Sequence, residues 1–459
     1  FRRFFAEGAF SQAFIPVYNE YEEHKTAAET KEFINNLSGT LLTFLFGFTL
    51  LALFLAPIFI LLFAPGFYFD PLKKDIAVDV LRIMFPYLGL ISLVAFAGGI
   101  QNSHKKFSLP AATPVVFNLC IILSAFFLAP IFSVPIFGLA WGVLLAGIIQ
   151  LLIQLAPLKQ IDRLPIPRLD FNNQGVKKVF FLMLPALLAG GVAQINLLID
   201  TIFASLLITG SPTWLYVSDR LIQFPLGIFA IAIGTVLLPT LSKANQNENF
   251  NLFKDQLKKS QQLVMFLAIP SFVGLALCSD HLISTLFQRG EFTFSDVHQA
   301  SKSLIAFSLG LPFFMLMKVL VPAFFSRQDT KTPMYAAIAA LISNIILNYI
   351  FVFILGYDHA GLALASSISA SLSCGILFLI LVNGKYIQLQ NPFNRFNLSI
   401  LTASIIVGIF LIYGPFNIDF NSLSFTERLL TLLLEVGFST LLYLGITRVV
   451  IGKSLRSLF

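Results

Sequence analysis

The stretch YVSDRLIQFPLGIFAIAIGTVLLPTLSK, residues 216–243, decides the fold class, because no charged residue interrupts it between Arg220 and Lys243. A helix needs roughly 20 mainly apolar residues to cross the hydrocarbon core of a bilayer. The whole chain has the same character: 57% of its 459 residues are hydrophobic and 12% are charged, whereas soluble domains average about 25% charged residues. The sequence therefore predicts an integral membrane protein.

Similar apolar windows, bounded by proline, glycine and charge clusters, run along the chain. They predict spans at 33–64, 78–100, 112–134, 136–157, 178–208, 213–242, 261–287, 299–325, 333–356, 360–382, 397–415 and 428–451. Residues 1–19 are typical of the later part of one more span. Backbone groups in lipid must be satisfied within the segment, and no alternating strands of about ten residues occur. We therefore expect an all-α polytopic membrane protein.

Basic residues are distributed unevenly between alternate loops. The seven segments on one side, from the loop after Tyr21 to the C-terminal tail, hold 20 Lys and Arg, and the loops on the other side hold 6. Cytoplasmic loops carry such an excess, so the first set and the C-terminus are predicted to be cytoplasmic. The net charge of +7 then reflects topology and contact with anionic membrane lipids, and no nucleic-acid partner is expected.

Three pairs of short matches are separated by the same distance along the chain. SHKKFSLP (103–110) pairs with SRQDTKTP (326–333), Gly-Leu-Ala at 138–140 pairs with 361–363, and the FIP ending at Pro16 pairs with the LLP ending at Pro239. We call this separation, the one from Pro16 to Pro239, the repeat spacing. Internal repeats of this kind are common in transporters. The chain is therefore predicted to contain two homologous halves.

The repeat predicts two six-helix lobes. Residues 1–157 would hold part of helix 2 through helix 6, a basic cytoplasmic linker would follow at 158–177, and residues 178–385 would hold helices 7–12. Residues 397–459 would add a C-terminal helix pair, helices 13 and 14, and a cytoplasmic tail. The span at 178–208 has no counterpart in the sequence, so we expect the intact protein to begin with one further helix.

Charged residues inside the spans are the first candidates for a binding site, because they need a partner or a water-filled cavity. Arg2 and Arg3 lie in the opening span, and Arg220 lies near the start of the second helix of the other half. Guanidinium groups that converge from both halves would form an anion site, and their bidentate geometry suits phosphate.

Other interpretations of these charges stay open. Arg3 and Glu7, at i and i+4, could form a structural ion pair. Asp219 adjoins Arg220 but points about 100° away from it. Lys318 is a further cation within a span, and it would either face the same cavity or reach a helix end by snorkelling.

A second set of polar residues suggests a cation site. Asp200 is a lone carboxylate in an apolar helix, Asn344 and Asn348 share one helical face, and Ser366 and Ser367 offer further oxygens. Together they would suit Na⁺, or Asp200 alone could take up a proton. Asparagines also hold membrane helices together, so a structural role is the alternative. No other metal site and no organic cofactor are predicted.

Enzyme motifs are largely missing. The sequence contains no G-x-x-x-x-G-K-[ST], H-E-x-x-H or G-x-S-x-G. The three cysteines, Cys120, Cys278 and Cys374, are far apart and adjoin apolar runs, so buried, inert thiols are expected. Without an ATP site, transport would draw on ion gradients, the membrane potential or downhill flow.

Four segments resemble the MurJ (MviN) family of bacterial lipid II flippases: RRFFAEGAFSQAFIP (2–16), APGF (64–67), YVSDRLIQFPLGIFAIAIGTVLLPTLSK (216–243) and FFSRQDTKTP (324–333). That family belongs to the multidrug/oligosaccharidyl-lipid/polysaccharide exporter superfamily. The resemblance implies fourteen helices, in two lobes and a terminal pair. It also implies movement of lipid II, the undecaprenyl-pyrophosphate-linked peptidoglycan precursor, to the outer leaflet of the inner membrane by alternating access.

The resemblance also assigns roles to residues. Arg2 and Arg220, with Arg3 adjacent, match cavity arginines that would engage the pyrophosphate, and Asp219 matches an acidic neighbour. An acidic position of one family member is Gln223 here, which departs from that pattern. The family's cation site falls on the set named above, Asp200, Asn344, Asn348 and Ser366 or Ser367. The last two helices would hold the polyprenyl tail, and other cell-wall synthesis proteins are candidate partners.

Two alternatives remain. An exporter of another polyprenyl-linked glycan or of drugs would use the same fold, but drug exporters favour acidic cavities, and the charges here are mostly basic. A membrane-embedded glycosyltransferase or acyltransferase would need a catalytic base beside a cleft. Asp219 and His104 are the only candidates for that base, and neither has a partner at an informative spacing.

Overall fold

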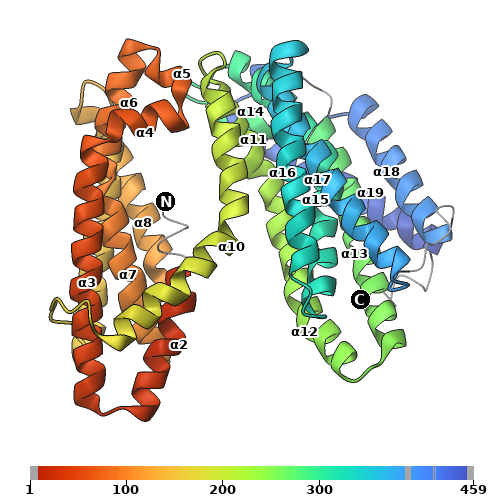
Figure 1. Ribbon diagram of the computed structural model, residues 1–459. Helices are drawn as coiled ribbons and strands as arrows, with labels where there is room; N and C mark the ends of the chain where they lie inside the picture. Colours follow the sequence, from red (N-terminus) through yellow and green to blue (C-terminus); the bar gives the residue numbers. More distant parts are fainter. Residues whose placement is uncertain (1–8, 388–393, 417, 419, 452–459) are drawn as a thin grey trace. The chain divides into compact units, whose positions relative to one another are not determined.

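The computed structural model describes residues 9–387, 394–416, 418 and 420–451 (Figure 1). The chain divides after Ile202 into two compact units. Over the described ranges it consists of helices and their connections, without a strand. The predicted all-α fold class is confirmed. Arg2, Arg3 and Glu7 lie outside the described residues.

The first unit is built from consecutive helices. They are α2 (Ala9–His24), α3 (Ala27–Phe54), α4 (Ala56–Phe63), α5 (Pro65–Tyr68), α6 (Pro71–Met84), α7 (Pro86–Ser103), α8 (Ser108–Phe127), the 3₁₀ turn η1 (Ala129–Ile131), α9 (Ile136–Gln160) and most of α10 (Gln174–Ser205). Helices α7, α8 and α9 pack against one another.

The second unit contains the remaining helices. They are α11 (Ser211–Pro225), the π-helical turn η2 (Leu226–Ala230), α12 (Ile231–Gln246), α13 (Phe250–Leu277), α14 (Ser279–Phe287), α15 (Phe294–Phe325), α16 (Lys331–Tyr349), the π-helical turn η3 (Ile350–Ile354), α17 (Asp358–Asn383), α18 (Arg395–Tyr413), the 3₁₀ turn η4 (Phe420–Ser422) and α19 (Phe425–Ile451). Helix α15 packs against α13 and α17, and α18 packs against α19.

Eleven helical segments within the described ranges are long and apolar enough to cross a membrane. They coincide with eleven of the twelve predicted spans, and α10, which ends at Ser205, covers most of the twelfth, at 178–208. The prediction of a multi-pass membrane protein is confirmed. Three predicted spans divide between two α-helices each: 33–64 into α3 and α4, 78–100 into α6 and α7, and 261–287 into α13 and α14. At the first break Pro57 lacks the N–H that would continue α3.

The helix bounds recur at the repeat spacing found in the sequence. Helices α3 and α13 begin at Ala27 and Phe250 and end at Phe54 and Leu277, so both of their bounds are separated by the repeat spacing. The starts of α8 and α16, and the ends of α9 and α17, keep the same separation. Equivalent positions in the two halves can therefore be compared residue by residue.

The first turns of α3 and α13 are capped at equivalent positions. Thr26 accepts a hydrogen bond from the N–H of Glu29, whose carboxylate accepts one from the N–H of Thr26 at 2.8 Å. Asn249, the equivalent of Thr26 in the second half, accepts one from the N–H of Leu252 at 3.0 Å. Both side chains satisfy backbone donors that a helix leaves unpaired. Each helix therefore starts where its half of the sequence supplies a cap.

The division between the units falls within α10. Val176 and Val179, near its start, belong to the core that α2, α3 and α7 form. Ala204, near its end, packs with Val352 and Leu362 in the second unit. The lobe bounds predicted from the sequence, 1–157, 178–385 and 397–459, stay a prediction.

The segment between α9 and α10, within the predicted linker at 158–177, is held against the first unit. The N–H of Ile166 donates to Oδ1 of Asn35 at 2.7 Å, and the N–H of Arg168 donates to the Asn35 carbonyl at 3.0 Å. Gly39 is required beside this contact, because a Cβ there would overlap the Arg168 carbonyl group. The linker is therefore an ordered strap rather than a free connection.

Candidate functional site

Helix α11 is fixed to α15 along one face. The indole Nε1 of Trp214 donates to Asp296 at 2.8 Å, and the hydroxyl of Ser218 donates to the Ala300 carbonyl at 2.7 Å. Trp214 and Ser218 are buried. Positions 216, 220 and 223, which follow helical periodicity on another face, are exposed. Packing of α11 therefore turns Arg220 away from the core of its own unit.

The Arg220 guanidinium is held by uncharged groups. It lies 4.7 Å from the centroid of the Tyr216 ring, and Nη1 donates to Oε1 of Gln223 at 3.5 Å. The Gln223 amide donates in turn to Asp219. No ion pair to Arg220 occurs within the described part of the chain. The guanidinium is oriented without being neutralised, which suits the binding of an anion.

The other candidate cations are less informative. Arg2 and Arg3 lie outside the described residues, so their meeting with Arg220 stays a prediction. Lys318 is exposed on α15, and its backbone carbonyl packs closely against Gly234 of α12. Both interpretations of Lys318, a cavity cation and a snorkelling side chain, stay predictions.

Three of the predicted cation-site residues lie together. Asn348 donates to Oδ1 of Asn344 at 2.9 Å, and Asn344 donates to Oγ of Ser366 at 3.1 Å, which links α16 to α17. The neighbouring Ser367 faces α15 instead and donates to the Ala306 carbonyl at 2.7 Å. Asp200 lies on α10 in the other compact unit. These bonds are those expected of helix-linking asparagines, and binding of Na⁺ stays a prediction.

An apolar groove of about 460 Å³ lies beside the two C-terminal helices. Its walls come from α11, η2, α13, α14, α18 and α19, and include Phe266, Pro270, Val407 and Leu444. The hydroxyl of Tyr443 lies in the wall but is satisfied, since it donates to the Phe266 carbonyl at 2.7 Å. The groove therefore offers a hydrocarbon surface inside the second unit.

Comparison with known proteins identifies the family. The sequence model of the family described as lipid II flippase MurJ matches residues 1–430. The chain belongs to the MurJ family. It is 41% identical over 471 residues to a probable lipid II flippase MurJ of Vibrio cholerae serotype O1, covering 100% of this chain and 88% of the relative. It is 36% identical to the lipid II flippase MurJ of Burkholderia cenocepacia, and the match covers 92% of this chain and 82% of that relative.

Solved structures agree with this assignment. The structure described as lipid II flippase MurJ in an inward closed conformation matches 99% of this chain and 90% of its own, with a TM-score of 0.80 and 28% identity. An inward-facing multidrug resistance MATE transporter matches at a TM-score of 0.66 and 13% identity. The match covers 82% of this chain and 86% of the transporter, and it shows a shared fold alone. The MurJ family consists of transporters, so the prediction of a transporter rather than an enzyme is confirmed.

One buried carboxylate of this MurJ family member escaped the sequence analysis. Glu435 of α19 is 1% exposed, and His281 Nδ1 lies 2.9 Å from its Oε2. The thiol of Cys278, which also lines the apolar groove, donates to Oε1 at 3.5 Å. A single Glu in the apolar run TLLLEVGF is the same signal that marked Asp200, and it could have marked Glu435.

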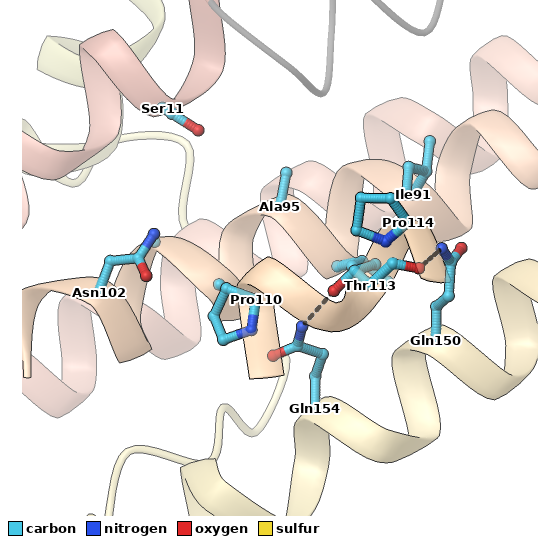
Figure 2. A pocket seen from close by; sticks show the side chains of 12 residues that line it. Ser11, Ile91, Ala95, Asn102, Pro110, Thr113, Pro114, Gln150 and Gln154 are labelled. Carbon is cyan, nitrogen blue, oxygen red and sulfur yellow. Dashed lines mark hydrogen bonds between the residues drawn. The ribbon is translucent and has the colours of Figure 1, made fainter. Parts of the chain in front are cut away.

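A group of glutamines in the first unit was also missed. Gln150 and Gln154 of α9 reach α8, where Gln150 donates to the Thr113 carbonyl at 2.8 Å and Gln154 donates to the Thr113 hydroxyl at 3.1 Å (Figure 2). Gln101 of α7 donates to Gln154. Gln150 and Gln154 lie at i and i+4 in an apolar span. The same pattern identified Asn344 and Asn348 as candidates, so it could also have identified these glutamines.

A charged cluster joins the ends of α2 and α7 to the linker. Glu22 accepts hydrogen bonds from Arg163 Nε at 2.7 Å and from the Tyr18 hydroxyl at 2.7 Å, and His104 Nε2 lies 3.7 Å from Glu22. Partial burial opposes ionisation of Glu22, but the bonds from Arg163 and Tyr18 outweigh it and hold its pKa below the ordinary value. These contacts fix the basic linker and assign it a structural role in the MurJ fold.

Proposed function

We propose that the protein flips lipid II from the cytoplasmic to the outer leaflet of the bacterial inner membrane by alternating access. The family match over residues 1–430 and the 28% identical MurJ structure support this substrate class. The C-terminus lies in the cytoplasm in this proposal, which follows from the excess of basic residues in the loops on that side.

In this proposal arginines bind the pyrophosphate, and the argument rests mainly on Arg220. Its guanidinium is exposed within the membrane-spanning segment Ser211–Gln246 and stacks on Tyr216. Placing an arginine at membrane depth costs free energy unless it faces a water-filled cavity or binds a ligand. Arg2 and Arg3 supply further guanidiniums, and Asp219 orients the Gln223 amide against Arg220.

The polyprenyl tail occupies the apolar groove beside α18 and α19. Its walls are mostly hydrocarbon. The hydroxyls of Ser271 and Thr440 donate to carbonyls of their own helices, whereas the buried hydroxyl of Ser439 has no described hydrogen-bond partner. Satisfied hydroxyls add little polarity to the groove. Binding of the tail here leaves the charged head group to the arginines, so that one molecule uses both an anion site and a hydrocarbon site.

Coupling to an ion remains part of the proposal. Na⁺ would take the oxygens of Asn344, Asn348 and Ser366, with Asp200 as the charged ligand, and a proton on Asp200 is the alternative. Replacing external Na⁺ by K⁺ at constant membrane potential separates the two. A Na⁺-coupled cycle slows under that exchange, whereas a proton-coupled cycle continues.

The arginine role is tested by substitution in the full-length protein. Arg220→Ala should reduce the lipid II accessible to an externally added lipid II-cleaving enzyme by at least tenfold in spheroplasts, and Arg220→Lys should retain part of the activity. Arg395→Ala removes an exposed arginine at the start of α18 and should leave transport unchanged. Normal transport by a correctly inserted Arg220→Ala protein would contradict the proposal.

A further inference from the structure

A polar pocket lies inside the first unit, and none of the residues assigned to the pyrophosphate, the ion or the tail is in its lining. It is lined by α2, α7, α8 and α9 and has a volume of about 190 Å³. A water molecule occupies about 30 Å³ in the liquid, so the pocket has room for about six waters or for one sugar ring. We call it the amide pocket, after Asn102, Gln150 and Gln154 in its wall (Figure 2).

The wall of the amide pocket is polar but uncharged. Its polar side chains are Ser11, Asn102, Thr113, Gln150 and Gln154, and the rest of its lining is apolar or glycine. The rings of Pro110 and Pro114 supply flat apolar surface next to these groups (Figure 2). Donors, acceptors and apolar faces in this combination suit neutral ligands rich in hydroxyl and amide groups rather than a phosphate or a cation.

One acceptor in this wall has hydrogen-bonding capacity to spare. Gln150 is 3% exposed, and its Nε2 donates to the Thr113 carbonyl at 2.8 Å. No described residue donates to its buried Oε1. Leaving a buried acceptor unsatisfied costs about 1–3 kcal/mol. This oxygen lies behind the wall, where a water-sized group in the pocket does not touch it, so a ligand would bond it only after the Gln150 side chain turns toward the pocket.

The equivalent region of the second half shows that the fold does not need this polarity. At the repeat spacing, the equivalents of Gln101, Thr113 and Gln154 are Phe324, Ala336 and Leu377, and all three are buried in an apolar core. Gly234, the equivalent of Ser11, packs against the carbonyl of Lys318, the equivalent of Ala95. Gln150 has a polar equivalent, Ser373, which is buried and whose Oγ has no described hydrogen-bond partner. At the other positions named, the second half closes with close packing where the first half keeps a polar pocket.

We propose that the amide pocket binds an uncharged portion of the lipid-linked head group, through the hydroxyl and amide groups of its sugar-peptide part. This inference rests on the proposed function and adds a second contact point for the same substrate. In this proposal the amide pocket distinguishes ligands that carry a sugar-peptide part from ligands that carry the tail and diphosphate alone.

The test compares two probes on purified full-length protein: lipid II, and undecaprenyl pyrophosphate, which has the same tail and diphosphate but no sugar. Ala95→Leu fills the pocket without removing a hydrogen bond, and Gln150→Leu removes the amide. Each should weaken lipid II binding about tenfold and leave the affinity for undecaprenyl pyrophosphate unchanged. Ala111→Leu, on the exposed side of α8, is the matched control and should change neither.

The outcomes separate the two proposals. Arg220→Ala should weaken both probes, because both carry the diphosphate. If Arg220→Ala has that effect and Ala95→Leu and Gln150→Leu bind lipid II as tightly as the unmodified protein, the pocket holds solvent only and this inference is overturned. If the unmodified protein binds neither probe, the proposed function itself fails. Equal loss of both probes in Ala95→Leu would also overturn sugar selection by the pocket.

Discussion

The two halves solve the same packing problem in different ways. In the second half, α12 and α15 approach so closely that a Cβ on Gly234 would lie 2.7 Å from the Lys318 carbonyl oxygen. In the first half the equivalent helices, α2 and α7, carry Ser11 and Ala95 at these positions and border the amide pocket. A duplicated fold can therefore keep one half as a packed core and open the other to a polar ligand.

The largest expected effect is destabilisation of the second half, where α12 and α15 pack closely. Gly234→Val should lower the free energy of unfolding by about 3 kcal/mol, because a β-branched side chain cannot avoid a backbone carbonyl by rotating. Ser11→Val, at the equivalent position in the first half, should change it by no more than about 0.5 kcal/mol. Thermal unfolding in detergent, followed by tryptophan fluorescence, measures both. Equal loss in the two variants would contradict the comparison.

A smaller effect is expected when the open half receives the residue of the closed half. Gln154→Leu copies Leu377 but removes the bonds to Gln101 and Thr113, and it should cost about 2 kcal/mol because buried polar groups lose their partners. The control Gln160→Leu, at an exposed position near the end of the same helix, should lie within about 0.5 kcal/mol of the unmodified protein. A neutral or stabilising Gln154→Leu would show that the glutamines are not a connected network.

The smallest expected effect concerns the charged cluster in which the linker contacts the ends of α2 and α7. The first half pairs Glu22 with Arg163 here, whereas in the second half the residues equivalent to His104 and Arg163 are Arg327 and Tyr386, which stack at 3.8 Å. Glu22→Gln should cost about 1 kcal/mol at neutral pH, a discounted value because the pair is partly exposed.

The pH dependence of that pair has a definite sign. The pKa of Glu22 is lowered in the folded protein, so the carboxylate stabilises the fold above its ordinary pKa of 4.5, and this contribution is lost as the pH falls through the folded value. The difference in unfolding temperature between Glu22→Gln and the unmodified protein should therefore vanish in acid. A difference that grows below pH 4.5 would contradict this assignment.

Much of the fold could be predicted because the bilayer demands long apolar segments. The spans and the repeat spacing appear directly as hydropathy and short matches, and the helix bounds keep that spacing. The break after Phe54 was not predicted, because the apolar run continues through it and a single proline decides where the helix ends. The bonds of the strap to Asn35 join residues that are far apart in the sequence, which periodicity cannot reveal.

The candidate site was predicted less completely. Arg220, Asn344 and Asn348 stood out as polar residues in apolar spans, and the structure gives them partners. Glu435 carried the same signal and was missed, as were the glutamines of the amide pocket, whose role depends on three helices meeting. Whether an unsatisfied acceptor or a hydroxyl lines a pocket depends on how the helices pack in three dimensions. The pattern of residue types along the chain does not predict this.

The central claim is that this chain moves lipid II across the bilayer. The most direct measurement places the purified full-length protein in liposomes that contain fluorescent lipid II and follows the fraction accessible to an external quencher. We predict that lipid II is exchanged between the leaflets faster than in protein-free liposomes, and that Arg220→Ala abolishes the difference. An exchange rate equal to that of empty liposomes, with the protein folded and inserted, would contradict the account.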